Sequence, residues 1–183
     1  MKSRLILLVI VLFLATPLWM RIAWEFSPTK RLNVIIADKT VLDANSYKHR
    51  SINWILDHNK YVKEDGGFYD INKDYFGFFP QEDEQYLIHD FDNLNEPELD
   101  SMSKGNDLLY IADTYGILGN EWYRHRDRNE NSGSIYGGLS EKDLLLIQKM
   151  DDADKLVVAE FNSDRKSTRL NSSHTVISYA VFC

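Results

Sequence analysis

Acidic residues stand at or just beyond the ends of the apolar segments that have the composition of strands. They are Asp38, Asp90 with Asp92, Asp113 and Glu160. Ligands of an open parallel sheet bind beyond the carboxyl ends of its strands, so we expect these acids to form one ligand-binding rim. Clustered carboxylates bind a hard divalent cation such as Mg²⁺ or Ca²⁺, or exchange a proton in acid–base catalysis. Asp38 and Asp113 are the candidate metal ligands.

Two other interpretations of these acids stay open. An aspartate at a strand end commonly accepts hydrogen bonds from the backbone of the following loop or helix, which is a structural role. Asp38-Lys39-Thr40 also matches in part the phosphoryl-transfer motif in which a strand-end aspartate nucleophile precedes Lys-Thr-Gly-Thr, but Val41 and Leu42 replace the Gly and Thr. The sequence therefore assigns no catalytic residue.

A second candidate is the aromatic stretch "DYFGFFP", whose rings are Tyr75, Phe76, Phe78 and Phe79. Flat rings stack on sugar faces, so the stretch is a candidate glycan platform. The alternative, which we favour, is that the rings form a small core of their own within an ordered loop. We expect residues 63–84 to be that loop because glycines and Pro80 interrupt regular structure there.

The elements that position these residues alternate between strands and helices. Apolar runs at 32–38, 85–92, 107–113 and 155–162 predict strands, and segments at 46–62, 95–105 and 139–150 predict helices. The predicted N-caps are Ser46, Asn95 and Ser140, the last with Asp143 in a capping box. We predict an α/β fold in which a mostly parallel sheet is flanked by helices, as in flavodoxin-like proteins.

The N-terminal segment, residues 1–27, is directed to a membrane. Lys2 and Arg4 precede an uninterrupted apolar run over 5–20, and Trp19 and Trp24 stand where an aromatic belt meets the membrane interface. We expect one transmembrane helix within residues 5–24 that anchors the chain in the cytoplasmic (inner) membrane, with residues 28–163 outside the cytoplasm. The alternative is a cleaved signal peptide and a secreted or periplasmic protein.

The formal net charge is −7, from 21 basic and 28 acidic residues. A surface this acidic argues against nucleic acid and against an anionic membrane face as partners. Cations, neutral glycans and basic protein patches remain as partners.

Five segments in succession carry a family resemblance: "NVIIADKT", "YLIHDFDNLNEPEL", "DLLYIADTYG", "YGGLSEKDLLLIQKM" and "KLVVAEFN". Together they resemble the class I glutamine amidotransferase-like superfamily, in particular its non-catalytic, membrane-anchored bacterial relatives of the trehalose-utilisation-protein type, whose function is uncharacterised. The resemblance covers residues 32–163 and implies an amidotransferase-like fold. It does not imply glutaminase chemistry, because Glu160 and the two residues after it stand where that chemistry needs a cysteine, and residues 1–163 contain none.

Residues 164–183 contain the single cysteine and an Asn-Ser-Ser sequon. This stretch back-translates, base for base, to a widely used sequencing adapter, so we interpret it as adapter read-through. The α/β domain at 28–163 is then expected to be C-terminally incomplete.

The leading functional hypothesis is a membrane-tethered extracytoplasmic binding or accessory module that acts on cell-envelope glycans. One alternative is a metal-dependent hydrolase that uses the strand-end carboxylates. A further alternative is a scaffold subunit of a membrane complex. Apart from a divalent cation, no cofactor is predicted.

Overall fold

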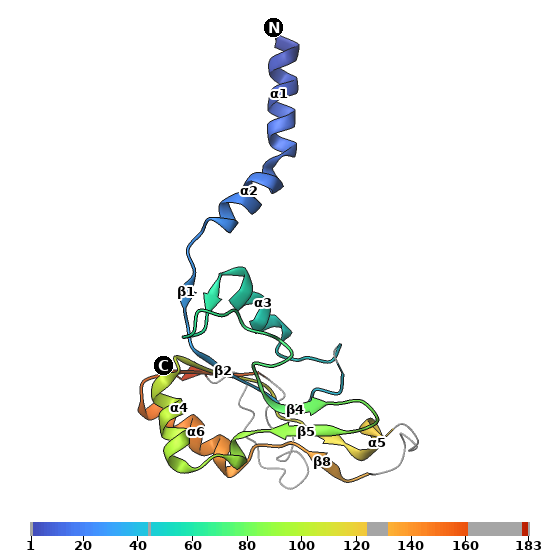
Figure 1. Cartoon of the computed structure of the whole chain (residues 1–183), viewed down its shortest axis with the longest axis vertical. Helices are drawn as coiled ribbons and strands as arrows, with labels where there is room; N and C mark the ends of the chain where they lie inside the picture. The colour runs from blue at the N-terminus through green and yellow to red at the C-terminus, as the bar shows by residue number, and fades with distance from the viewer. Residues whose placement is uncertain (1, 44, 124–131, 161–180, 183) are drawn as a thin grey trace. The chain divides into compact units, whose positions relative to one another are not determined.

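The computed structural model describes residues 2–43, 45–123, 132–160 and 181–182, which belong to two compact units, Met1–Lys30 and Arg31–Cys183. The first unit contains two helices, α1 (Lys2–Leu14) and α2 (Thr16–Glu25), separated at Ala15 (Figure 1). Pro17 lies in the first turn of α2, where its missing N–H costs no helical hydrogen bond. Two helices are therefore present where the sequence predicted one transmembrane helix. Within the described ranges, no helix has both the length and the apolar character needed to cross a membrane.

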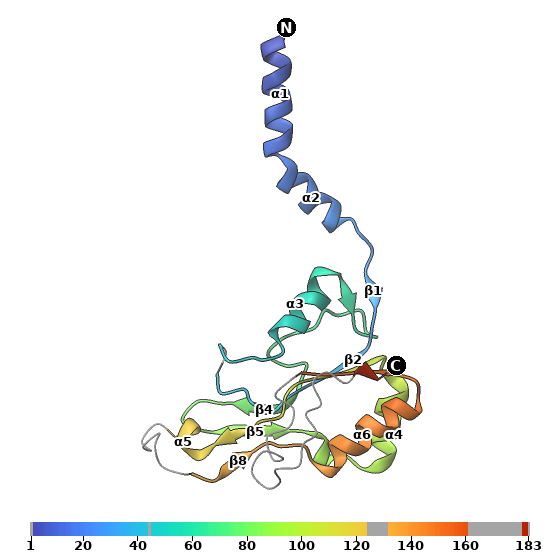
Figure 2. The same ribbon diagram turned by 180° about the vertical axis from the view of Figure 1, so that it is seen from behind.

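The second unit contains a six-stranded sheet in the order β10-β9-β6-β2-β4-β5 (Figures 1 and 2). Neighbouring strands β9, β6, β2 and β4 are parallel, whereas β5 and β10 pair antiparallel with β4 and β9. The bounds are β2 (Val34–Asp38), β4 (Phe76–Pro80), β5 (Tyr86–His89), β6 (Leu108–Asp113), β9 (Leu156–Ala159) and β10 (Val181–Phe182). The predicted α/β fold with a mostly parallel sheet is thus confirmed.

Helices cover both faces of this sheet. Because side chains alternate along a strand, Val34 and Ile36 pack on one face with α3 (Arg50–His58), and Ile35 packs on the other with α4 (Glu96–Gly105) and α6 (Glu141–Asp152). Figure 2 shows α3 on one side of the sheet and α4 and α6 on the other. All of β2 is buried, as its continuous apolar run predicts.

Two of the three predicted helix caps are confirmed. The side chain of Asn95 accepts a hydrogen bond from the N–H of Glu98 at the start of α4, and Ser140 and Asp143 form the same reciprocal box at α6. The predicted cap at Ser46 is wrong because its hydroxyl accepts hydrogen bonds from the loop N–H groups of Leu42 and Asp43. The helix begins only after this turn, so α3 is shorter than predicted.

Regular structure is also present within the predicted loop at 63–84. Residues 76–80 form β4 despite Gly77 and Pro80, because a glycine lets β4 approach β2 closely: a Cβ on Gly77 would lie 1.8 Å from the carbonyl oxygen of Asp38. The chain before α6 adds α5 (Gly119–Trp122) and a hairpin of β7 (Ile117–Leu118) with β8 (Ser134–Tyr136). The other small elements are β1 (Lys30–Arg31), which pairs with β3 (Tyr61–Val62), and the turn η1 (Phe91–Asn93).

Part of the predicted adapter-derived segment, residues 164–180 and 183, lies outside the described residues. Val181 and Phe182 form β10, opposite Val158 and Val157 of β9.

Candidate functional site

Asp38, at the end of β2, is fully buried and bonded to the chain around it. Its Oδ2 accepts hydrogen bonds from the backbone N–H of Lys48 at 2.8 Å and of His49 at 3.2 Å, and lies 2.7 Å from His49 Nδ1. Its Oδ1 accepts a bond from the N–H of Thr40 at 3.2 Å. The carboxylate therefore holds the loop after β2 against the start of α3.

His49 extends this arrangement toward the loop between β3 and β4. The second ring nitrogen, Nε2, lies 3.0 Å from the carbonyl oxygen of Ile71, and the whole side chain is buried. Its ring packs on Tyr75 with a centroid distance of 4.6 Å. One side chain thus links the end of β2 to the residues that precede β4.

Lys39 is the buried cation of the rim, with 2% of its surface exposed. Its Nζ lies 2.6 Å from Oδ2 of Asp143, in the first turn of α6, and 4.0 Å from Oδ2 of Asp90. Tyr136 donates a hydrogen bond to the same Asp90 oxygen at 2.9 Å, and its ring lies 5.7 Å from Nζ. Neither Lys39 nor Asp143 belongs to the rim predicted from the sequence, because neither is an acid at a strand end.

The predicted rim forms only in part. Asp38 and Asp113 are paired in the register of β2 and β6, whereas Asp90 lies near Nζ of Lys39. Asp92 is exposed, while Glu160 accepts a hydrogen bond from the hydroxyl of Tyr110. Three of the predicted acids, Asp38, Asp90 and Asp113, are therefore buried in the interior of the unit.

Asp113 is also engaged. Its Oδ1 accepts a hydrogen bond from the N–H of Tyr115 at 2.7 Å, and its side chain also bonds to Thr40. Burial raises the pKa of the Asp113 carboxyl above its ordinary value. Within the described residues, no group of three or more His, Cys, Asp or Glu side chains is placed to hold a metal ion.

The aromatic residues of β4 pack against one another and against the core: Phe78 is buried, and Phe76 and Phe79 are partly buried. Phe78 is fully buried, and Tyr75, next to the strand, is 2% exposed and donates a hydrogen bond to the carbonyl oxygen of Phe78. Phe79 stacks on Tyr75 at a centroid distance of 4.2 Å, and Phe76 on Phe91 at 4.5 Å. These contacts favour the packing interpretation over an exposed sugar platform.

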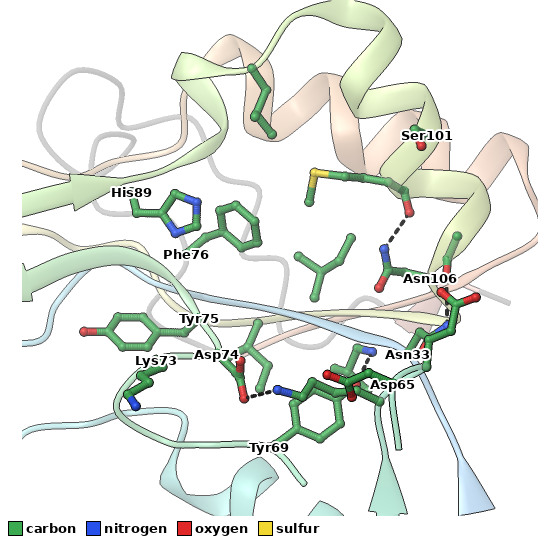
Figure 3. Close-up of a pocket in the computed structure, with 18 of the residues that line it drawn as sticks. Asn33, Asp65, Tyr69, Lys73, Asp74, Tyr75, Phe76, His89, Ser101 and Asn106 are labelled. Atoms are coloured by element: carbon green, nitrogen blue, oxygen red, sulfur yellow. Dashed lines mark hydrogen bonds and ion pairs between the residues drawn. The ribbon is translucent and has the colours of Figure 1, made fainter. Parts of the chain in front are cut away.

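A pocket of about 760 Å³ opens beside β2 (Figure 3). It is bounded by the first residues of β2, by the loop at 63–75 and by α4. We call it the edge pocket. Its lining includes the apolar and aromatic residues Val34, Ile35, Ile36, Tyr69, Tyr75, Phe76, Leu94 and Met102, and the polar residues Asn33, Lys63, Glu64, Asp65, Lys73, Asp74, His89, Glu98, Ser101 and Asn106.

The pocket exists because the β4-side edge of β2 is paired only at its two ends. The N–H of Leu32 donates to the carbonyl of Val62, after which the chain leaves the edge, and it returns only where Phe76 pairs with Ala37. Between these points the hydroxyl of Tyr69 accepts a bond from the N–H of Val34 and donates to the carbonyl of Leu32, both at 2.7 Å. In the described part of the chain, no strand pairs with the rest of this edge.

Negative charge predominates in the edge pocket. Its ionic lining comprises four carboxylates and two ammonium groups. Lys63 is bonded to Asp74 at 2.9 Å, an interaction that raises the pKa of the Lys63 ammonium, and Lys73 lies 3.8 Å from Asp70. The exposed carboxylates of Glu64, Asp65 and Glu98 leave the pocket net acidic.

None of the predicted acids lines the edge pocket, although Tyr75 and Phe76 of the predicted aromatic set do. Its residues come from segments far apart in the sequence, and only the interruption of the strand pattern between Val62 and Phe76 marks its position. A scan against protein-family models, a search of curated proteins and a search of solved structures each give no match to this chain.

Proposed function

We propose that the α/β unit is a binding module whose ligand occupies the edge pocket. The observation that carries this proposal is the position of the pocket, where backbone of β2 without a neighbouring strand meets aromatic, amide and carboxylate side chains. Ligand sites of this kind combine apolar surface with a few fixed polar groups. The acidic lining favours neutral or cationic ligands, in agreement with the net charge of −7.

The contacts of the buried acids favour binding over metal-dependent hydrolysis. Asp38, Asp90 and Asp113 are each at most 3% exposed and already accept hydrogen bonds from the protein. A hydrolytic carboxylate must instead reach a metal, a water molecule or the substrate. Their contacts fit the structural role that strand-end aspartates commonly have.

The proposal is tested by filling the pocket with a large side chain. Ser101 is exposed on α4 and lines the pocket, so Ser101→Trp should block ligands and leave the helix intact. Lys104→Trp, at an exposed position of α4 that does not line the pocket, is the matched control. Fragment binding to the full chain in mild detergent is measured by ligand-observed NMR. Fragments that bind the wild type and Lys104→Trp but not Ser101→Trp support the proposal. Equal binding to both variants contradicts it.

We also propose that residues 5–24 attach the chain to a membrane, with residues 28–163 outside the cytoplasm. Support comes from the large apolar side chains exposed on α1 and α2, among them Leu7, Phe13, Trp19 and Met20. Apolar surface of this extent is unfavourable in water. Two helices joined at Ala15 also suit a segment that lies partly in the membrane interface.

Alkaline carbonate extraction of membranes tests this attachment. The full chain should stay in the pellet, and Val9→Lys with Leu12→Lys should release it, because charged groups are costly in the apolar part of a bilayer. The mass of the purified chain identifies the alternative: loss of the N-terminal segment means that it is a cleaved signal.

A further inference from the structure

On the basis of the proposed function, we propose that the edge pocket binds a short, basic peptide segment in an extended conformation. The peptide pairs with the open edge of β2 as an added strand would. The site is the stretch of edge between Leu32, where pairing with β3 ends, and Ala37, where pairing with β4 begins. Strand addition is a common way for proteins to recognise an extended peptide.

The backbone hydrogen bonds of Asn33 and Val34 show which edge of β2 each residue faces. The carbonyl of Asn33 accepts hydrogen bonds from residues at the start of β6, whereas the N–H of Val34 donates to Tyr69 on the opposite edge. Backbone groups of successive strand residues point to opposite edges. The carbonyl of Val34 and the N–H of Ile36 are therefore directed at the open edge in the edge pocket.

These two groups select the kind of ligand. One residue of an extended peptide that runs parallel to β2 presents its N–H and its carbonyl to the same side, so it pairs with the carbonyl of Val34 and the N–H of Ile36 at once. A single trans amide, such as the acetamido group of an amino sugar, points its N–H and carbonyl in opposite directions and satisfies only one of them. A peptide therefore fits the edge better than an isolated amide does.

Charge and space define the peptide further. Glu64, Asp65 and Glu98 surround the pocket, whereas both lining ammonium groups already lie near aspartates. A lysine or arginine at the central residue would lie among these carboxylates. The chain itself pairs with this edge at Leu32 and at Ala37, so the open stretch between them is short. The peptide segment that pairs there is therefore also short, with one central residue that makes both backbone hydrogen bonds.

The test uses the full chain in mild detergent and the probe acetyl-Ala-Lys-Ala methylamide, with dissociation constants from ligand-observed NMR titrations. N-methylation of the lysine amide removes the N–H that bonds to Val34, and we expect it to weaken binding by about tenfold or more. Replacing lysine by glutamate should weaken binding as well. Glu98→Gln should reduce the affinity for the lysine probe, whereas Glu96→Gln, on the same helix but outside the pocket, should not.

Other outcomes distinguish this inference from the proposed function. Equal affinity for the parent and N-methylated probes overturns strand addition. Binding of N-acetylglucosamine but of no peptide, blocked by Ser101→Trp, also overturns it and leaves the binding module intact. A dimer that dissociates in Ser101→Trp identifies a second copy as the occupant, which overturns the peptide proposal. If no probe or fragment is blocked by Ser101→Trp, the proposed function fails too.

Discussion

Nζ of Lys39 lies 2.6 Å from Oδ2 of Asp143, and both side chains are almost completely buried. Removing one partner of a buried ion pair leaves a charge without compensation, which typically costs about 3–5 kcal/mol. We therefore expect Lys39→Met to lower the free energy of unfolding by about that amount, measured by denaturant unfolding followed by tryptophan fluorescence. Lys149→Met, which removes the more exposed ion pairs of Lys149 in α6 with Glu96 and Asp100 in α4, is the control and should have a much smaller effect. A small loss in Lys39→Met would contradict a structural role for the buried pair.

Tyr69→Phe tests whether the hydroxyl of Tyr69 stabilises the edge of β2 at the place where no strand pairs with it. The hydroxyl bonds to the N–H of Val34 and to the carbonyl of Leu32. Its loss leaves both groups unpaired, at a cost of about 1–3 kcal/mol in the free energy of unfolding. Tyr86→Phe is the control because, within the described residues, the Tyr86 contacts are ring contacts. Equal stabilities of the two variants would show that the hydroxyl of Tyr69 does not support the edge.

The close approach of β4 to β2 makes Gly77 intolerant of a side chain. A Cβ there would lie 1.8 Å from the carbonyl oxygen of Asp38, and the backbone φ is 150°. We expect Gly77→Ala to destabilise the unit by several kcal/mol or to prevent folding, because backbone cannot yield as a flexible side chain does. Gly105→Ala, at the end of α4 with nothing within 4 Å of its Cβ, should be neutral or stabilising by up to about 1 kcal/mol. Thermal unfolding of both variants makes the comparison.

The raised pKa of Asp113 predicts a pH dependence of stability. Below the ordinary value of 3.8 the carboxyl is protonated in both the folded and the unfolded chain, so it contributes no slope. Above 3.8 the unfolded chain ionises first, and stability falls until the pH passes the raised folded-state pKa. Asp113→Asn keeps an acceptor for Tyr115 and cannot ionise, so it should lack this fall and be more stable relative to wild type at pH 7 than at pH 3.

Denaturant unfolding across this pH range checks the prediction. Asp92→Asn, at an exposed position, controls for the loss of one negative charge. A parallel pH profile for wild type and Asp113→Asn would contradict the prediction.

The interpretation of residues 164–183 predicts a result at the DNA level. Amplifying and sequencing the genomic locus past the codon of Ser163 should give codons that differ from those of this segment. The same codons in the genome would show that the segment belongs to the protein, including the cysteine and the sequon.

Local sequence signals predicted the central strands and the starts of two helices correctly. Continuous apolar runs gave β2 and β6, and side-chain caps gave the first residues of α4 and α6, because these features depend on residues close in sequence. The strand at 76–80 was missed because Gly77 interrupts a strand pattern locally, whereas its fit against Asp38 is a tertiary contact. The sequence alone does not show that contact.

The candidate site was less predictable for a related reason. Strand-end position predicted one rim of acids, but not that His49 would be buried against Asp38 or that Lys39 would be buried between Asp90 and Asp143. The edge pocket depends on where the 63–75 loop leaves β2, which no residue type specifies. The sequence pattern therefore predicted that these acids lie at strand ends, but not whether a ligand can reach them.

The loop after β2 also sets an order in which the chain completes its structure during synthesis. Asp38 bonds to His49, which is synthesised 11 residues later. The partner of Thr40, Gly116, follows 76 residues later, and the partner of Lys39, Asp143, follows 104 residues later. While α6 is still inside the ribosome, Lys39 has to remain in water, because its burial without Asp143 would be unfavourable. We therefore expect this loop to close late in co-translational folding, once α6 has left the ribosome.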